Sequence, residues 1–225
     1  RTGIWTDVRN HVDDPNGGFG PDASHTTTLD VSATISVSPY FGAVTKYRLF
    51  YEKRPGGGAF GYAVGDGTVT QVNTNATVAS LATIDVAGTE ALNITIVSAG
   101  ANGVRLFGAS LLNPTPGQMV MHKLGSGGAD AKRFKDIPEA YFKTAIEALE
   151  LDIACISFGT NEDSYNTPPN TFIDRGWAFI DLEAFFGSYS KANTLGLYAD
   201  IYHPNVYGGK LIGHSIFKGV FEKLI

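Results

Sequence analysis

Lys46-Tyr-Arg-Leu-Phe-Tyr-Glu-Lys53 alternates in character from one residue to the next. Three large side chains, Tyr47, Leu49 and Tyr51, fall on one face of an extended chain. The opposite face carries Lys46, Arg48 and Phe50. A period of two is typical of a strand that buries one face against a core. The segment is therefore predicted to be one strand of an antiparallel sheet.

The same alternation recurs on both sides of this segment. Seven short segments between residues 27 and 113 follow one another, most of them alternating, and Gly, Pro or Asn separates them. Their spacing is typical of an antiparallel sandwich, and no helical period interrupts them. We predict a β-sandwich, specifically a jelly roll, over residues 27–113. Residues 1–26 carry turn signals and no sustained period, so they are predicted to be an irregular lead-in.

The pattern changes after residue 114. A short apolar segment at 118–125 precedes an amphipathic one at 136–150, and an almost wholly apolar segment follows at 151–159. This order is typical of a βαβ unit in a parallel sheet covered on both faces. A further strand and short helix are predicted at 177–186, and a final helix at 206–223. The sequence thus predicts an α/β domain over residues 114–225.

Polar residues follow the apolar segments of this region. Asp200 lies three positions before His203, close enough for its carboxylate to accept the Nδ1–H of the imidazole. That contact would leave Nε2 facing a nucleophile as a general base. Asn161 follows the apolar segment at 151–159, and a glycine-rich turn follows the segment at 118–125.

These features together resemble blocks II, III and V of the SGNH hydrolases, also called GDSL-type esterases. The resemblance implies a flavodoxin-like, three-layer α/β domain with a parallel sheet. It implies that Gly128 and Asn161 form the oxyanion hole, and that Asp200 and His203 form the catalytic acid–base pair. Gly125 and Gly127 remain alternatives to Gly128.

The nucleophile is unknown. Block I, the Gly-Asp-Ser segment of the family, is not in these 225 residues, so we expect the serine in a part of a longer polypeptide. Ser126 is a weak candidate, because it follows a predicted strand and precedes a helix. Leu124 replaces the first glycine of the G-x-S-x-G pattern, however.

Some SGNH enzymes that act on polysaccharide acetyl groups carry a carbohydrate-binding-like sandwich inserted before block II, and the predicted sandwich stands in that place. The resemblance therefore implies an O-acetylesterase acting on an acylated polysaccharide, located outside the cell, in the periplasm or on a phage tail. The alternative is a non-catalytic carbohydrate-binding or adhesion protein on a degenerate SGNH fold. An α/β hydrolase that uses Ser126 is a third hypothesis.

Composition narrows the classes of partner. The net charge is −5 and no basic stripe is present, which argues against nucleic acid. No apolar run reaches the roughly 18 residues of a membrane span. The single cysteine, Cys155, excludes an intrachain disulfide. No metal-ligand spacing is evident, so no metal or cofactor is predicted, and the sequence leaves the oligomeric state open.

Overall fold

A computed structural model of the chain describes residues 1–9, 20–39, 43–113, 120, 122–124, 134, 136–151, 189–199 and 205–219. The chain divides into two compact units, Arg1–Cys155 and Ile156–Ile225, and each is considered by itself.

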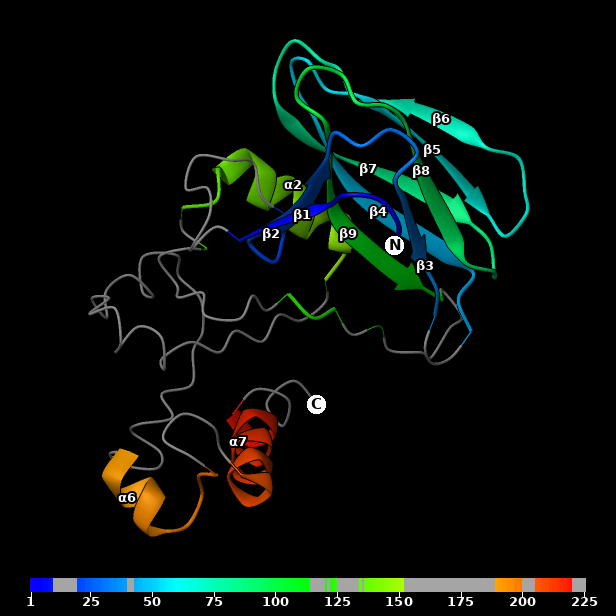
Figure 1. Ribbon diagram of the computed structural model, residues 1–225. Helices are drawn as coiled ribbons and strands as arrows, with labels where there is room; N and C mark the ends of the chain where they lie inside the picture. Colours follow the sequence, from blue (N-terminus) through cyan, green and yellow to red (C-terminus); the bar gives the residue numbers. More distant parts are fainter. Residues whose placement is uncertain are drawn as a thin grey trace. The chain divides into compact units, whose positions relative to one another are not determined.

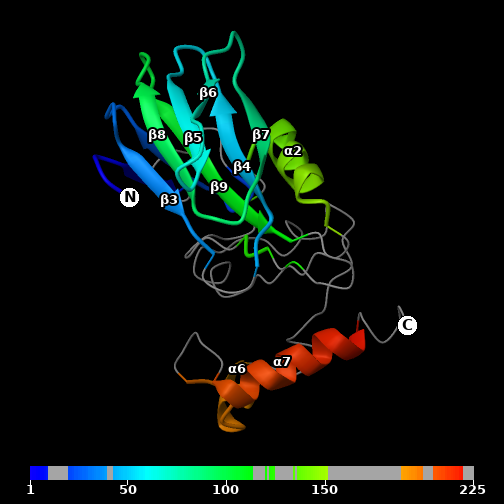
Figure 2. The same ribbon diagram turned by 90° about the vertical axis from the view of Figure 1, so that its right-hand side faces the viewer.

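The described part of the first unit is built on two antiparallel sheets (Figure 1; Figure 2). In the order of pairing, the five-stranded sheet contains β1 (Thr6–Arg9), β2 (Ser24–Thr28), β9 (Val104–Leu112), β4 (Lys46–Lys53) and β7 (Ser80–Ala87). The four-stranded sheet contains β3 (Thr34–Val37), β8 (Leu92–Ser98), β5 (Ala59–Val64) and β6 (Thr70–Asn73). Each of the seven predicted segments within 27–113 contains a strand, so the predicted β-sandwich is confirmed.

The main core lies between the two sheets. Tyr47 and Leu49 of β4 are 0% and 1% exposed there, as the period of two predicts. Tyr51 packs edge-on against Phe60 of β5, with 5.4 Å between ring centroids. Phe50 points the other way, into a second apolar cluster on the outer face of the five-stranded sheet. Burial of these side chains contributes roughly 25 cal/mol per Å² of apolar surface removed from water.

The prediction that residues 1–26 are irregular is wrong. They contain β1 and the first part of β2, which pair antiparallel with Thr6 opposite Thr27 and Arg9 opposite Ser24. β1 is an edge strand, and three of its four residues are exposed. Because neither of its faces is well buried, its sequence shows no apolar period, and its hydrogen bonds to β2 hold it in the sheet.

The helix predicted at 136–150 forms as α2 (Glu139–Leu149). It belongs to the first unit and packs on the outer face of the five-stranded sheet (Figure 2). This corrects the expectation that the segment packs on a parallel sheet of an α/β domain. The physical reason is that apolar side chains of the sheet and of the helix bury one another. Phe50, Leu81 and Phe107 of the sheet form one buried cluster with Ile137, Tyr141, Ala145 and Leu149 of the helix region.

Ionic contacts attach both ends of α2 to the sheet. At its C-terminal end, Arg48 of β4 donates to the carbonyl of Ala148 and, over 2.9 Å, to Glu150. Arg48 also binds Asp85 of β7 through two hydrogen bonds of 2.6 and 2.8 Å. In the first half of the helix, the Tyr141 hydroxyl donates to the buried Glu52 carboxylate over 2.7 Å.

Acid should weaken the Arg48–Asp85 contact. Hydrogen bonding to Arg48 lowers the pKa of Asp85 from 3.8 to about 2. The stabilisation is therefore complete above about pH 4 and is lost as the pH falls through about 2. Asp85 is 41% exposed, so solvent screening limits the effect to about 1 kcal/mol.

Urea unfolding of the parent and Asp85→Asn, at neutral pH and near pH 2, measures this effect. The difference in unfolding free energy between the two proteins should shrink towards zero in acid. A difference that stays constant with pH would contradict the assignment.

The described part of the second unit contains α6 (Tyr189–Thr194) and α7 (Val206–Gly219). α7 begins where the sequence predicted the final helix. Asn205 caps it, because its side-chain Oδ1 accepts the N–H groups of Tyr207 and Gly208 over 2.9 and 3.0 Å. Within the described residues, no helix has the length and apolar character needed to cross a membrane. The parallel strands predicted at 151–159 and 177–186 lie outside those residues, apart from Leu151.

Candidate functional site

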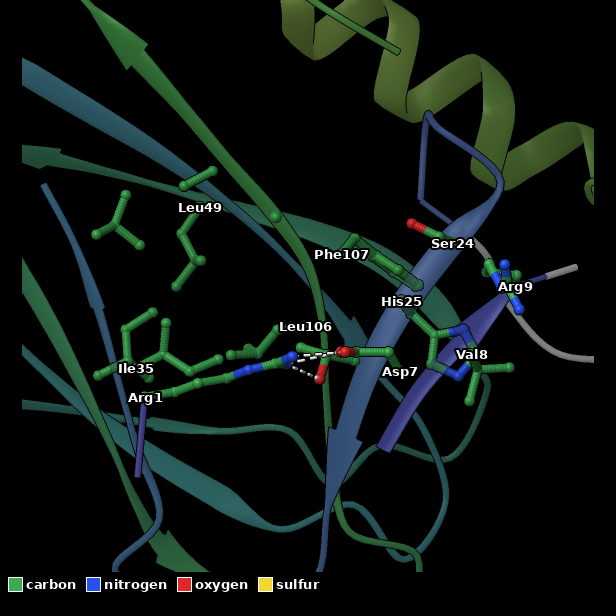
Figure 3. Close-up of a pocket in the computed structure, with 15 residues that line it drawn as sticks. Arg1, Asp7, Val8, Arg9, Ser24, His25, Ile35, Leu49, Leu106 and Phe107 are labelled. Carbon is green, nitrogen blue, oxygen red and sulfur yellow. Dashed lines mark hydrogen bonds and ion pairs between the residues drawn. The ribbon is translucent and has the colours of Figure 1, made fainter. Parts of the chain in front are cut away.

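The first unit contains a pocket of about 260 Å³ that reaches into the space between the two sheets (Figure 3). We call it the edge pocket, because β1 and β3 are edge strands of their sheets and both line it. Its floor is apolar and comes from inward-facing side chains of both sheets: Ile35, Val37, Leu49, Ile94 and Leu106. Polar side chains of the N-terminal segment and of β1 and β2 also line it: Arg1, Asp7, Arg9, Ser24, His25 and Thr26.

The pocket lies where the pairing of β2 with β9 stops. β2 pairs with β9 from Thr28 only as far as Thr26, which lies opposite Leu106. The next residue, Phe107, is the extra residue of a bulge, since Phe50 faces Gly108 while Tyr51 faces Leu106. Gly108 has φ 137°, a conformation that favours glycine. The end of the β2–β9 pairing and the bulge in β9 therefore both lie at the pocket.

Arg1 and Asp7 dominate the polar side of the pocket. The Arg1 guanidinium donates to both carboxylate oxygens of Asp7, over 2.7 and 2.5 Å, and to the hydroxyl of Thr26 over 3.2 Å. The hydrogen bond from Arg1 lowers the pKa of Asp7, so the carboxylate is ionised at neutral pH. The Arg1 guanidinium, a hydrogen-bond donor, and the Asp7 carboxylate, an acceptor, therefore lie side by side next to the apolar floor of the pocket (Figure 3).

This arrangement suits a ligand that combines apolar C–H surface with several hydroxyl groups. The carboxylate can accept hydrogen bonds and the guanidinium can donate them, while the floor contacts the apolar part. The described residues contain no group of three or more His, Cys, Asp or Glu side chains that could hold a metal ion.

Sequence reasoning missed the edge pocket. The one available signal was that Asp7 and Arg9 share a face of a short extended segment. That signal is weak, because the rest of the pocket comes from strands far along the chain. Thr26 of β2, for example, lies opposite Leu106 of β9, and both line the pocket.

The residues predicted to catalyse ester hydrolysis lie outside the described part of the chain. These are Ser126, Gly128, Asn161, Asp200 and His203. The structure therefore neither brings them together nor separates them. The residues on both sides of the Asp200–His203 segment are described, and hydrogen bonds join them. Asn205 donates its N–H to the carbonyl of Leu197 over 2.9 Å and its side-chain amide to the carbonyl of Gly196 over 2.6 Å.

Comparison with known proteins found no matching family model and no matching curated protein. Among solved structures, an exo-β-1,3-galactanase from Phanerochaete chrysosporium in complex with β-1,3-galactotriose is 14% identical with a TM-score of 0.31. The similarity covers 48% of this chain and only 26% of the galactanase chain.

Two further similar structures are single modules. The C-terminal CBM6 of the laminarinase LamC from Zobellia galactanivorans is 14% identical, with a TM-score of 0.27, and is covered completely by 47% of this chain. The CBM36-1 domain of a xylanase from the hindgut metagenome of Trinervitermes trinervoides is 15% identical, with a TM-score of 0.25, and is covered completely by 48% of this chain. At such low TM-scores and identities, the similarities carry no argument about the function of this chain.

Proposed function

We propose that the β-sandwich unit binds carbohydrate, with the edge pocket as the binding site. The observation that carries the proposal is the Arg1–Asp7 pair next to an apolar floor. The alternative hypothesis from the sequence, a carbohydrate-binding or adhesion protein, is thereby the leading proposal for this unit.

The chemistry of a sugar ring matches both sides of the pocket. Neighbouring hydroxyls of a ring can each donate and accept a hydrogen bond, so a carboxylate and a guanidinium held together can satisfy two of them. The axial C–H groups form an apolar patch that can contact the partly exposed Ile35 and Val37. The volume of about 260 Å³ lies just below the roughly 300–1,000 Å³ of drug-sized ligand sites. One ring of a longer glycan is therefore the expected occupant.

Asp7→Asn is expected to weaken glycan binding by about tenfold. The substitution keeps the shape of the side chain but removes the charge, and hydrogen bonds to a charged group are worth about 1.5–3 kcal/mol. A glycan array identifies a bound sugar, and calorimetric titration of parent and variant with that sugar gives the two dissociation constants.

Asp66→Asn is the matched control, because Asp66 is an exposed carboxylate in the turn after β5 and does not line the edge pocket. Equal affinities for the parent and both variants would exclude the edge pocket as the site. Absence of any bound sugar on the array would reject carbohydrate binding for the whole unit.

Ester hydrolysis by residues 114–225 is a second proposal. Its support is the order of the sequence motifs, together with hydrogen bonds between the described residues that flank the Asp200–His203 segment. The hydrogen bonds from Asn205 to Leu197 and Gly196 join the two flanks of that segment, and α7 starts directly after it. An acylated polysaccharide would then be both the bound glycan and the substrate.

A further inference from the structure

A second pocket, of about 280 Å³, opens on the outer face of the five-stranded sheet. We call it the outer-face pocket. Phe50, Phe107 and Leu149 supply apolar wall, and Leu149 is the last residue of α2. The pocket shares Phe107, Gly108 and Ala109 with the edge pocket. The bulge in β9 therefore borders a pocket on each face of the sheet.

Four polar side chains line the outer-face pocket: Asp22, Ser110, His122 and Lys123. The Ser110 hydroxyl lies 3.3 Å from Nδ1 of His122. Within the described residues the His122 ring makes no other hydrogen bond, so Nε2 remains able to bind a ligand. Burial and the charge of Arg48 lower the pKa of His122, and the ring is neutral at neutral pH.

Asp22 is held in place by its neighbour. One of its carboxylate oxygens accepts the N–H of Ser24 over 3.1 Å, and the other accepts the Ser24 hydroxyl over 2.8 Å. A carboxylate offers about four lone-pair positions, so acceptor capacity remains after these two contacts. The residue between them, Ala23, has φ 59° and is 1% exposed. A buried residue in the left-handed region is a strained feature of the kind found beside binding sites.

We propose that the outer-face pocket is a second ligand site and that it takes a neutral, hydroxyl-bearing ring. This inference rests on the proposed carbohydrate binding of the unit. The negative charge of Asp22 is offset by the positive charge of Lys123, so the pocket carries little net charge to bind a small anion or cation. The His122 imidazole and the Ser110 hydroxyl can each donate or accept a hydrogen bond. The hydroxyl groups of a sugar ring can pair with such side chains, because a hydroxyl can also donate or accept.

Titration of the isotope-labelled chain with galactose, glucose and N-acetylglucosamine tests the proposal by amide chemical shifts. Binding of one of these sugars in the outer-face pocket should shift the amide signals of Ser110, His122 and Lys123. Binding in the edge pocket should separately shift the amide signals of Asp7 and Thr26. His122→Leu should weaken binding at the outer-face pocket by about three- to tenfold, the worth of one or two neutral hydrogen bonds. It should leave the affinity measured at Asp7 and Thr26 unchanged.

Asp7→Asn is the reciprocal control and should affect only the edge pocket. Ser110→Ala removes the hydroxyl with less loss of packing, and it replaces His122→Leu if thermal unfolding shows that the leucine variant is not folded. Sugar-dependent shifts at Asp7 and Thr26, with none at Ser110, His122 and Lys123, would overturn the second site and leave the proposed function intact. If Asp7→Asn abolishes the sugar-dependent shifts at both pockets, the second site is overturned too. The shifts at Ser110, His122 and Lys123 would then be an indirect effect of binding in the edge pocket.

Two further outcomes are decisive. Shifts at Ser110, His122 and Lys123 with sodium phosphate or sodium acetate, but with no sugar, would make the outer-face pocket an anion site and refute the proposed ligand class. Absence of sugar shifts anywhere would reject the second site together with the proposed function of the edge pocket.

Discussion

Glu52→Ala is expected to lower the free energy of unfolding by about 3–5 kcal/mol. Glu52 is 2% exposed, and its carboxylate accepts the Tyr141 hydroxyl and pairs with Arg105 over 3.0 Å and with Arg54 over 3.5 Å. Without the carboxylate, two guanidinium groups lose the negative charge between them, and the Tyr141 hydroxyl loses its acceptor. Burial is the largest cause that lowers the pKa of Arg54, and the nearby Arg105 lowers it further.

Urea unfolding followed by circular dichroism measures the loss. Glu147→Ala is the matched control, because the Glu147–Lys143 pair spans 3.6 Å on the surface of α2, with both side chains well exposed. Such a pair is worth about 0.3–0.5 kcal/mol. Tyr141→Phe removes one hydroxyl, and its loss of unfolding free energy should lie between those of Glu52→Ala and Glu147→Ala, at about 1–3 kcal/mol. If Glu52→Ala costs no more than Glu147→Ala, the buried ionic cluster does not hold α2 on the sheet.

His203→Ala is expected to abolish ester hydrolysis while leaving glycan binding nearly unchanged. Loss of a general base in enzymes of the Ser-His-Asp type costs on the order of 10⁴–10⁶ in rate, because the barrier rises without loss of ground-state contacts. Asn161→Ala removes a proposed oxyanion donor and should cost roughly 10²–10³. The assay follows release of acetate from a small acetyl ester by the longest natural polypeptide that contains these residues.

Asp7→Asn provides the converse control, since it should weaken glycan binding and leave hydrolysis of a small ester unchanged. Full activity after His203→Ala would reject the proposed base. A polypeptide that contains an upstream Gly-Asp-Ser and still shows no hydrolysis would leave carbohydrate binding as the function of the chain.

Local pattern was sufficient to predict the strands and helices that carry a regular apolar period. The alternation in Lys46–Lys53 predicts the strand and the face that lies between the sheets, because Tyr47 and Leu49 must leave water together. It does not predict that the opposite face, with Phe50, is buried too. The apolar stripe of α2 is predicted for the same reason. The start of α7 is predicted by its place after Pro204. For the proposed catalytic residues, the sequence supplies motifs and their order, and the described structure adds only the hydrogen bond from Asn205 to Leu197.

Only the tertiary structure decided what the strands and helices pack against. β1 is polar and lies at an edge, so its place in the sheet comes from hydrogen bonds to β2 and not from any apolar period. The apolar stripe of α2 fits any apolar surface, and one of the ionic contacts to this surface joins Arg48 to Glu150, 102 positions apart. The edge pocket likewise depends on a bulge in β9 and on residues from six strands together with Arg1. Periodicity records whether a residue is buried, whereas a site depends on which distant residues meet, and that is fixed by long-range packing.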